Sequence, residues 1–166
     1  MQKRKKRASV WAVLLALVCV ISSMSVFGVT AKAEEDVSVM TTSDGRFEYV
    51  EDTEHGGYKI TTYLKDEKTV EIPSEIDGTP VKAIGKYLFY QKDPVTVKIP
   101  DSVVTIGDGV FFQCTNLTNV TLSDNIKTLP WCTFYQCTGL ESIKLPSKLE
   151  AIMDGSAGDS LRLIRP

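Results

Sequence analysis

The chain has 166 residues and a formal net charge of −2, and 43% of its residues are hydrophobic, which suffices for one domain with a modest core. Six of the 19 lysines and arginines and none of the 21 acidic residues lie in residues 1–33, so the remainder carries a net charge of −8. An acidic chain of this kind has no electrostatic reason to bind nucleic acid or anionic lipid, and we expect neither as a partner.

The first 33 residues have the layout of a secretory signal peptide. Five positive charges at residues 3–7 precede an uncharged stretch at 8–31, whose densest apolar part runs from Val10 to Ile21. Ala31-Lys32-Ala33 then offers small residues where signal peptidase reads them, which predicts cleavage after Ala33 and a secreted or extracellular protein without a membrane contact. The alternative is an uncleaved anchor, because the 24 uncharged residues could just span a bilayer.

Residues 34–68 lead into an array of repeats. Residues 34–45 are acidic and rich in Ser and Thr, which predicts a short disordered leader. Two β-rich runs, Phe47–Val50 and Tyr58–Leu64, flank Glu54-His55-Gly56-Gly57 and predict a β-hairpin within 46–68. Because the first coil of a repeat stack would otherwise expose its core and an unpaired strand edge, the hairpin is expected to be an N-terminal cap.

A pattern then returns every 23 residues. Short apolar strands begin at Val70, Val97, Val120 and Ile143, and a turn at residues 77–80 lengthens the first interval to 27 residues. A fixed period in the range of roughly 20–50 residues indicates a solenoid, in which one supersecondary unit stacks on copies of itself.

Between the strands, each unit carries an aromatic pair, which we expect on one short helical turn. Phe89, Phe111 and Phe134 hold the same position of successive units and are expected to stack inside the coil, where burial of each contributes about 1.5–3 kcal/mol. Cys114 and Cys137 also share one repeat position, so the spacing is compatible with a disulfide between neighbouring coils and with two buried thiols.

Within each strand, apolar and polar residues alternate, so that one set of side chains faces the core and the other faces outward. The outward set predicts a ligand-binding surface on the concave side of the coil. It consists of Thr69, Glu71, Thr96, Lys98, Asn119, Thr121, Ser142 and Lys144.

The repeat reads I-G-x-x-x-F-x-x-C-x-x-L-x-x-V-x-I-P and resembles the BspA-like (treponemal) type of leucine-rich repeat, found on secreted and surface proteins of bacteria and some protozoa. The resemblance covers about Tyr58 to Pro146. It implies a mainly-β, right-handed repeat solenoid with one strand per coil and short helical turns over residues 69–149. It also implies a role in adhesion or protein binding, and it carries over no catalytic residue. Two interpretations of residues 150–166 stay open: a degenerate last repeat that serves as a cap, or an array of repeats that is cut short at this point.

Three functions compete. The first is a binding or adhesion module for a protein or glycan ligand, for example on a host or neighbouring cell. The second is a vestigial or truncated structural unit without a ligand, with self-association through an open C-terminal edge. An enzyme is not expected, because the chain lacks Gly-x-Ser-x-Gly, His-Glu-x-x-His and a phosphate loop. Its one histidine, His55, indicates no metal site, and we expect no cofactor. The hairpin acids are expected to form a solvated face: Glu48, Glu51, Asp52 and Glu54.

Overall fold

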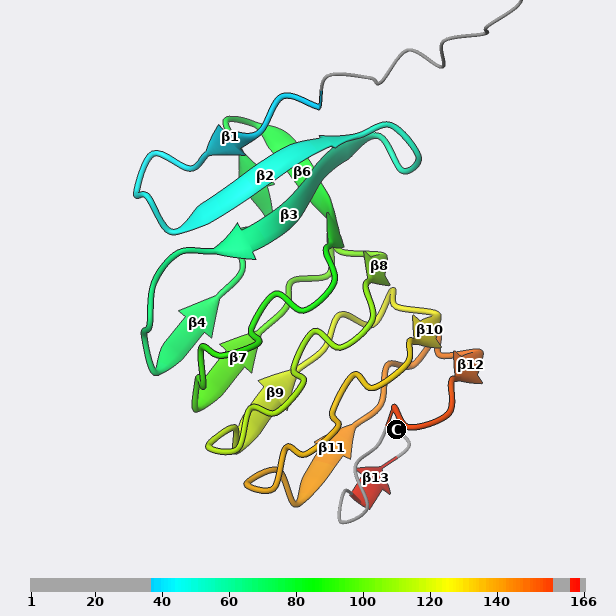
Figure 1. Ribbon diagram of the computed structural model, residues 1–166. Coiled ribbons are helices and arrows are strands. Elements are labelled where there is room, and N and C mark those ends of the chain that lie inside the picture. The colour runs from blue at the N-terminus through cyan, green and yellow to red at the C-terminus, as the bar shows by residue number, and fades with distance from the viewer. Residues whose placement is uncertain (1–36, 157–161, 165–166) are drawn as a thin grey trace, which may run out of the picture. The chain divides into compact units, whose positions relative to one another are not determined.

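The computed structural model describes residues 37–156 and 162–164, so the signal peptide expected over residues 1–33 lies outside the described residues. Over the described residues the chain is a mainly-β solenoid whose coils are about 23 residues apart, with a β-hairpin at its start (Figure 1). This architecture confirms the fold predicted from the repeat.

The first stack of strands is the one whose onsets the period predicts. It contains β4 (Thr69–Glu71), β7 (Thr96–Lys98), β9 (Asn119–Thr121), β11 (Ser142–Lys144) and β13 (Arg162–Ile164). Strands β4, β7 and β9 form one parallel sheet, and β11 pairs in parallel with β13.

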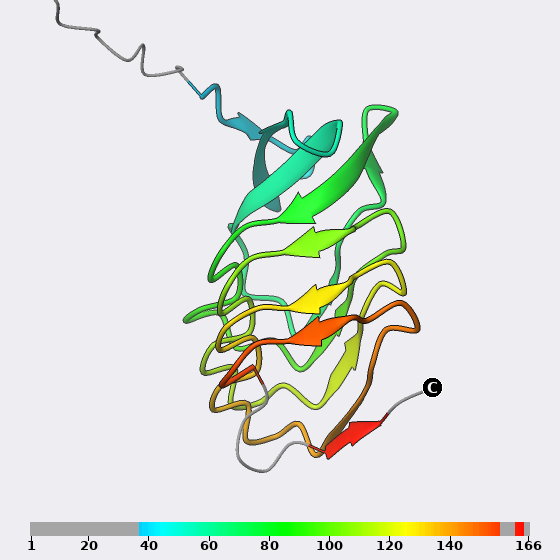
Figure 2. The same cartoon turned by 90° about the vertical axis from the view of Figure 1, so that its right-hand side faces the viewer.

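A second stack lies along another side of the coils (Figure 2). It contains β3 (Gly57–Tyr63), β6 (Thr79–Ile84), β8 (Thr105–Ile106), β10 (Thr128–Leu129) and β12 (Ala151–Ile152). Strands β3, β6 and β8 pair in parallel, as do β10 and β12. The expectation of one strand per coil is therefore wrong. At every coil boundary except the one between β8 and β10, the second apolar segment pairs with its own copy one coil away. This pairing satisfies backbone groups that a lone turn would leave open.

The short helical turns expected for the aromatic pairs are β-turns instead, and no helix occurs in the described ranges. In the middle coil the N–H of Phe112 donates to the carbonyl oxygen of Gly109 at 2.9 Å, which is a three-residue spacing. Gln91, Gln113 and Gln136 then have positive φ angles of 62°, 61° and 57°. A left-handed residue ends any right-handed helical progression, so each turn stops there.

The cap is the predicted hairpin with an additional edge strand. Strand β2 (Phe47–Asp52) pairs antiparallel with β3 on one side and with β1 (Met40–Thr41) on the other. The leader expected to be disordered over 34–45 is thus ordered at β1, because the edge of β2 offers it hydrogen-bond partners. Asp52 is also buried rather than solvated: its carboxylate accepts bonds from the N–H groups of Glu54 and His55 and lies 2.9 Å from Nδ1 of His55.

A short extra hairpin accounts for the longer first interval. Strand β5 (Glu75–Ile76) pairs antiparallel with the start of β6 through the two-residue turn Asp77-Gly78. Both turn residues have positive φ angles, of 50° and 80°, as a tight hairpin turn between right-twisted strands requires.

The core is organised around a column of phenylalanine rings. Phe89, Phe111 and Phe134 are fully buried, and successive ring centroids lie 5.5 and 5.3 Å apart with the planes within 7° of parallel. The predicted ladder is confirmed. It continues into the cap, where the buried ring of Tyr63 lies 5.5 Å from that of Phe89 and 5.2 Å from that of Phe47.

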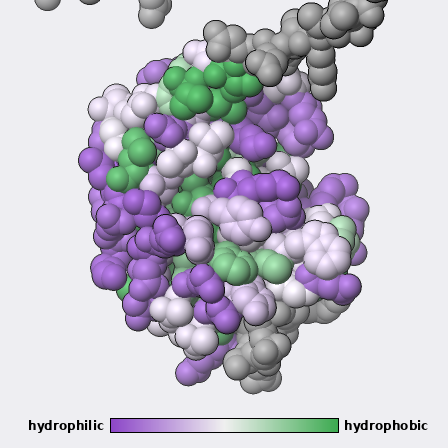
Figure 3. Space-filling view, viewed as in Figure 1, coloured by the Kyte–Doolittle hydropathy of each residue, from purple (hydrophilic) through white to green (hydrophobic). Residues whose placement is uncertain are grey.

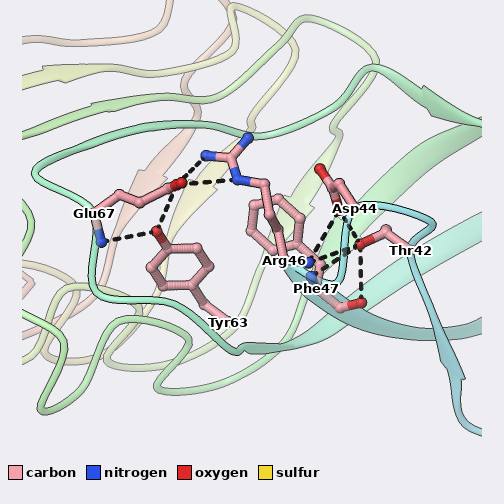
Figure 4. Close-up of polar contacts among 6 residues, drawn as sticks. All are labelled: Thr42, Asp44, Arg46, Phe47, Tyr63 and Glu67. Atoms are coloured by element: carbon pink, nitrogen blue, oxygen red, sulfur yellow. Dashed lines mark hydrogen bonds and ion pairs between the residues drawn. The ribbon is translucent and has the colours of Figure 1, made fainter.

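A polar cluster closes the cap end of this column (Figure 4). The hydroxyl of Tyr63 donates to the Glu67 carboxylate at 3.0 Å, and the guanidinium of Arg46 donates to the same oxygen and lies 5.4 Å above the ring of Phe47. Burial raises the pKa of Tyr63, and the bond from Arg46 lowers the pKa of Glu67. The one buried hydroxyl of the column therefore has a charged acceptor, which makes its burial tolerable.

Close packing of the coils requires glycine at Gly107. A Cβ atom there would lie 2.6 Å from the backbone nitrogen of Lys86 and 2.8 Å from the carbonyl carbon of Gly85, and backbone atoms cannot rotate away. Gly107→Ala is therefore expected to lower the free energy of unfolding by about 1–3 kcal/mol, measured by urea denaturation.

Pro130 provides the matched control for this substitution, because it holds the same repeat position one coil later. Pro130→Ala is expected to change stability by less than about 1 kcal/mol, mainly through the entropy of the unfolded chain. Equal losses of unfolding free energy in the two variants would show that the contact between Gly107 and the preceding coil is not unusually close.

Candidate ligand-binding surface

The outward side chains of the first stack form two registered rows, which we call the strand ridge. Thr69, Thr96 and Asn119 are Cα partners across β4, β7 and β9, and so are Glu71, Lys98 and Thr121. Ser142 and Lys144 extend the rows onto β11. Of these eight residues seven are exposed and Thr96 is half-buried. Hydrophilic side chains cover this part of the molecule in the space-filling view (Figure 3).

The rows follow from the alternation within each strand. The residues between them point inward, and Val70, Val97 and Ile143 are at most 2% exposed. Burial of these valines and isoleucine fixes the register, because a shift by one residue would turn the whole apolar set outward. The structure thus brings together all eight residues that the sequence predicts for the ligand-binding surface.

The charges on the ridge are unevenly paired. Nζ of Lys98 donates to Oε1 of Glu71 at 2.7 Å, and this bond lowers the pKa of Glu71 and raises the pKa of Lys98. Among the described residues Lys144 forms no ion pair. The ridge is therefore locally neutral at β4 and β7 and presents a positive charge at β11.

The ladder of the ridge is interrupted between β9 and β11. At the preceding boundary the N–H of Ile99 donates to the carbonyl oxygen of Thr121, and the N–H of Thr118 donates to that of Val95, both at 2.9 Å. The corresponding bonds one coil later would join the N–H of Leu122 to the carbonyl oxygen of Lys144 and an N–H of the next coil to the carbonyl oxygen of Thr118. Both bonds are absent in the described part of the chain. The facing N–H and carbonyl groups of β9 and β11 therefore form no hydrogen bonds with each other.

A cleft of about 410 Å³ occupies this interruption. Val120, in the middle of β9, is half-buried, whereas its counterparts on β4 and β7 are fully buried. We call the cleft the β9–β11 window. Its lining residues are Thr118, Asn119, Val120, Thr121, Gly139, Glu141, Ser142, Ile143 and Lys144.

The window is closed at both ends. The N–H of Gly139 donates to the carbonyl oxygen of Thr115 at 3.1 Å, and a Cβ atom at Gly139 would come within 2.8 Å of that oxygen. At the other end the N–H of Ser147 donates to Oδ1 of Asp124 at 3.0 Å. The two coils are therefore held together on either side of the opening, which makes the window part of the folded structure.

The same coil boundary is open in the second stack, between β8 and β10, and Pro130 accounts for one of the missing bonds. The N–H groups of Gly85, Gly107 and Met153 donate to the carbonyl oxygens of Ile60, Ile84 and Leu129 one coil away. Pro130 holds the equivalent position and has no N–H to donate. A second cleft, of about 470 Å³, lies there. Its lining residues are His55, Val104, Thr105, Ile106, Asn125, Lys127, Thr128, Pro130 and Lys148.

The sequence reasoning missed five of the window residues: Thr118, Val120, Gly139, Glu141 and Ile143. The period predicts an unbroken ladder, so it gives no reason to look between two strands. Pro130, which replaces the glycine of Gly85 and Gly107, marks a missing donor in the second stack only, so the sequence contains no comparable signal for the window.

The three cysteines within the described residues are free thiols. Cys114 and Cys137 are buried, and their Sγ atoms donate to the carbonyl oxygens of Phe89 and Phe111 at 3.4 and 2.9 Å. Of the two arrangements that the spacing allows, the structure has the buried thiols, which fill the coil beside the phenylalanine column.

Two further features concern metals and membranes. In the described ranges no three His, Cys, Asp or Glu side chains gather in a group that could hold a metal ion. Nor does that part of the chain contain a helix with the length and apolar character needed to cross a bilayer.

Solved structures share this fold. A leucine-rich repeat protein from Bacteroides capillosus aligns with a TM-score of 0.69 at 24% identity, over 78% of this chain and 99% of that protein. The Treponema pallidum leucine-rich repeat protein aligns with a TM-score of 0.64 at 30% identity, over 76% of this chain and 64% of the other.

A leucine-rich cell surface protein from Faecalibacterium prausnitzii aligns with a TM-score of 0.63 at 28% identity, over 73% of this chain. This chain spans only 31% of that protein. No curated protein sequence matches the chain. The model of the BspA-type leucine-rich repeat region matches residues 68–160, with six copies of the repeat. The match covers more than half of the sequence, and the chain therefore belongs to the BspA-type leucine-rich repeat family.

Proposed function

We propose that this protein is a secreted or cell-surface binding module that attaches to a macromolecule on a host or neighbouring cell through its strand ridge. The observation that carries the proposal is the exposure of two registered polar rows on a rigid parallel sheet. Rigid rows of this kind present side chains to a ligand without a large ordering cost on binding. The cell-surface description of the Faecalibacterium relative supports the location.

The size of the ridge limits its affinity. Three paired strands about 4.8 Å apart, with the fourth approaching the third to within 8 Å, give a surface less than about 20 Å wide. A standard protein interface buries about 800 Å² on each partner. We therefore expect a modest affinity for a single copy and a clear gain when several copies are displayed together on one surface.

The combined variant Lys98→Ala, Thr121→Ala, Lys144→Ala tests the ridge. Binding of the full chain to immobilised mucin, extracellular-matrix proteins and bacterial wall polysaccharide is measured by surface plasmon resonance. For any probe that the wild type binds, we expect the variant to raise Kd by about 10- to 100-fold, because the three substitutions remove central polar contacts.

A matched control carries Lys59→Ala, Thr62→Ala and Lys65→Ala in and just after β3, with the same change of charge and composition. It should bind as the wild type does. Unchanged binding by the ridge variant would place the ligand on another face. Absence of binding to every probe, by a folded and multivalent wild type, would favour the structural unit without a ligand.

A further inference from the structure

The β9–β11 window differs from the rest of the ridge in what it offers a ligand. Between β4, β7 and β9 the facing strand edges are paired, and only side chains are free at those two junctions. In the window, carbonyl oxygens such as those of Thr118 and Lys144 and N–H groups such as that of Leu122 have no partner from the facing strand. Water satisfies such groups at an open surface, and a ligand that displaces the water has to supply both donors and acceptors.

The spacing of the two strands excludes an inserted peptide strand. Cα atoms of β9 and β11 approach to within 8 Å of each other. A strand placed between them in a continuous sheet would need about twice the ~4.8 Å strand spacing, or roughly 9.6 Å. The occupant is therefore a compact group, and the cleft volume of about 410 Å³ lies in the range of about 300–1,000 Å³ typical of small-ligand sites.

The lining favours a ligand rich in hydroxyl groups. Thr118, Thr121 and Ser142 contribute hydroxyls, Asn119 an amide, and the window also contains one carboxylate and one ammonium group. A hydroxyl both donates and accepts hydrogen bonds, so a polyol can satisfy this mixture together with the open backbone groups.

An apolar face of the ligand also has a partner. Val120 is half-buried and lines the window, where its accessible part can contact the C–H face of a ring. A charged ligand fits less well, because Glu141 and Lys144 present opposite charges at the same site.

We propose that the β9–β11 window binds a single sugar ring, as a free saccharide or as a unit of a glycan chain. This proposal rests on the proposed function, since the window is part of the strand ridge. It specifies that the ligand is a neutral saccharide and that the ligand binds between two neighbouring coils. The ring lies over the window, with its hydroxyls toward the strand edges of β9 and β11 and one C–H face toward Val120.

The test is a ¹⁵N–¹H NMR titration of the full chain with methyl glycosides of the common hexoses and N-acetylhexosamines, at millimolar concentrations. For at least one glycoside we expect saturable shifts centred on the amides of Thr121, Leu122 and Ser142. Titration with oligomers of the same sugar distinguishes a free saccharide from a glycan unit, since a unit within a chain binds as well as or better than the monomer.

Two substitutions remove single hydroxyls of the window without changing the fold of an exposed strand: Thr121→Val and Ser142→Ala. Each should weaken saccharide binding by roughly three- to tenfold, which is the loss expected for one neutral hydrogen bond. Thr62→Val in β3 makes the same exposed change outside the ridge and should leave the titration unaltered. Dispersed spectra of all three variants establish that they are folded.

Two results would overturn the saccharide proposal: no shift in the window for any glycoside, or shifts centred elsewhere on the molecule. Neither result decides whether the ridge binds a ligand. If a protein probe still bound in a way that depends on Lys98, Thr121 and Lys144, the proposed function would hold and only the saccharide proposal would fail. If neither a saccharide nor a protein probe bound to the ridge, the proposed function would fail as well.

Discussion

Replacing Phe111 by alanine is expected to lower the free energy of unfolding by about 3–5 kcal/mol. Phe111 is fully buried in the middle of the phenylalanine column, with the rings of Phe89 and Phe134 stacked on either side of it. Alanine removes the buried ring and both ring contacts and leaves a cavity that the rigid turns on each side cannot close. Because small domains are stable by only about 5–15 kcal/mol, the loss should shift the whole unfolding transition.

The neighbouring Phe112 provides the matched control. Its ring is half-exposed and stacks on that of Tyr135 at 5.2 Å on the outside of the same turn. Phe112→Ala should cost no more than about 1.5 kcal/mol, because the ring is only partly removed from water. Urea denaturation followed by circular dichroism compares the two variants. Equal losses would show that the inner column is not what holds the coils together.

The repeat made most of this architecture predictable. The 23-residue period fixes which residues stack, so the positions of Phe89, Phe111 and Phe134 in one buried column could be read from their spacing. The alternation within Thr96–Lys98 and its copies likewise assigned the ridge side chains, since burial of one set forces the other outward.

Features that depend on one coil differing from the next were not predictable from the period. The β9–β11 window exists because two neighbouring coils fail to pair, and a repeat pattern describes only what coils have in common. The β-turns were also missed, because the positive φ angles of Gln113 and its equivalents are unusual for glutamine. Strand β1 forms because β2 has a free edge, which the composition of residues 34–45 does not reveal.

The two buried thiols are expected to make the protein sensitive to alkaline pH. Burial raises the pKa of Cys114 and of Cys137 from 9.0 to about 12. Between these values the unfolded chain has lost protons that the folded chain still holds, so the stability falls as pH rises. The stability contributed by the protonated thiols is fully present below pH 9 and is lost by about pH 12. A difference of three pKa units corresponds to roughly 4 kcal/mol for each thiol as an upper limit.

The double variant Cys114→Ala, Cys137→Ala isolates this effect. Its stability at pH 7 should be lower than that of the wild type, since two buried side chains are shortened. Its decline between pH 9 and 11 should be distinctly shallower, although Tyr63, whose pKa is also raised by burial, contributes a slope of the same sign to both proteins. Urea denaturation at closely spaced pH values under reducing conditions measures the two slopes.

Cys132→Ala, at a half-buried position outside the phenylalanine column, is the matched control for the effect of a cysteine-to-alanine substitution on stability at pH 7. Identical slopes for the double variant and the wild type would mean that both thiols ionise in the folded chain as they do in the unfolded one. A protein proposed to work outside the cell is exposed to oxidants, so the protonation state of its buried thiols affects how long they survive. The thiolate is the nucleophile that reacts with oxidants and attacks disulfides, so thiols held protonated beside the phenylalanine column stay unreactive in an oxidising medium.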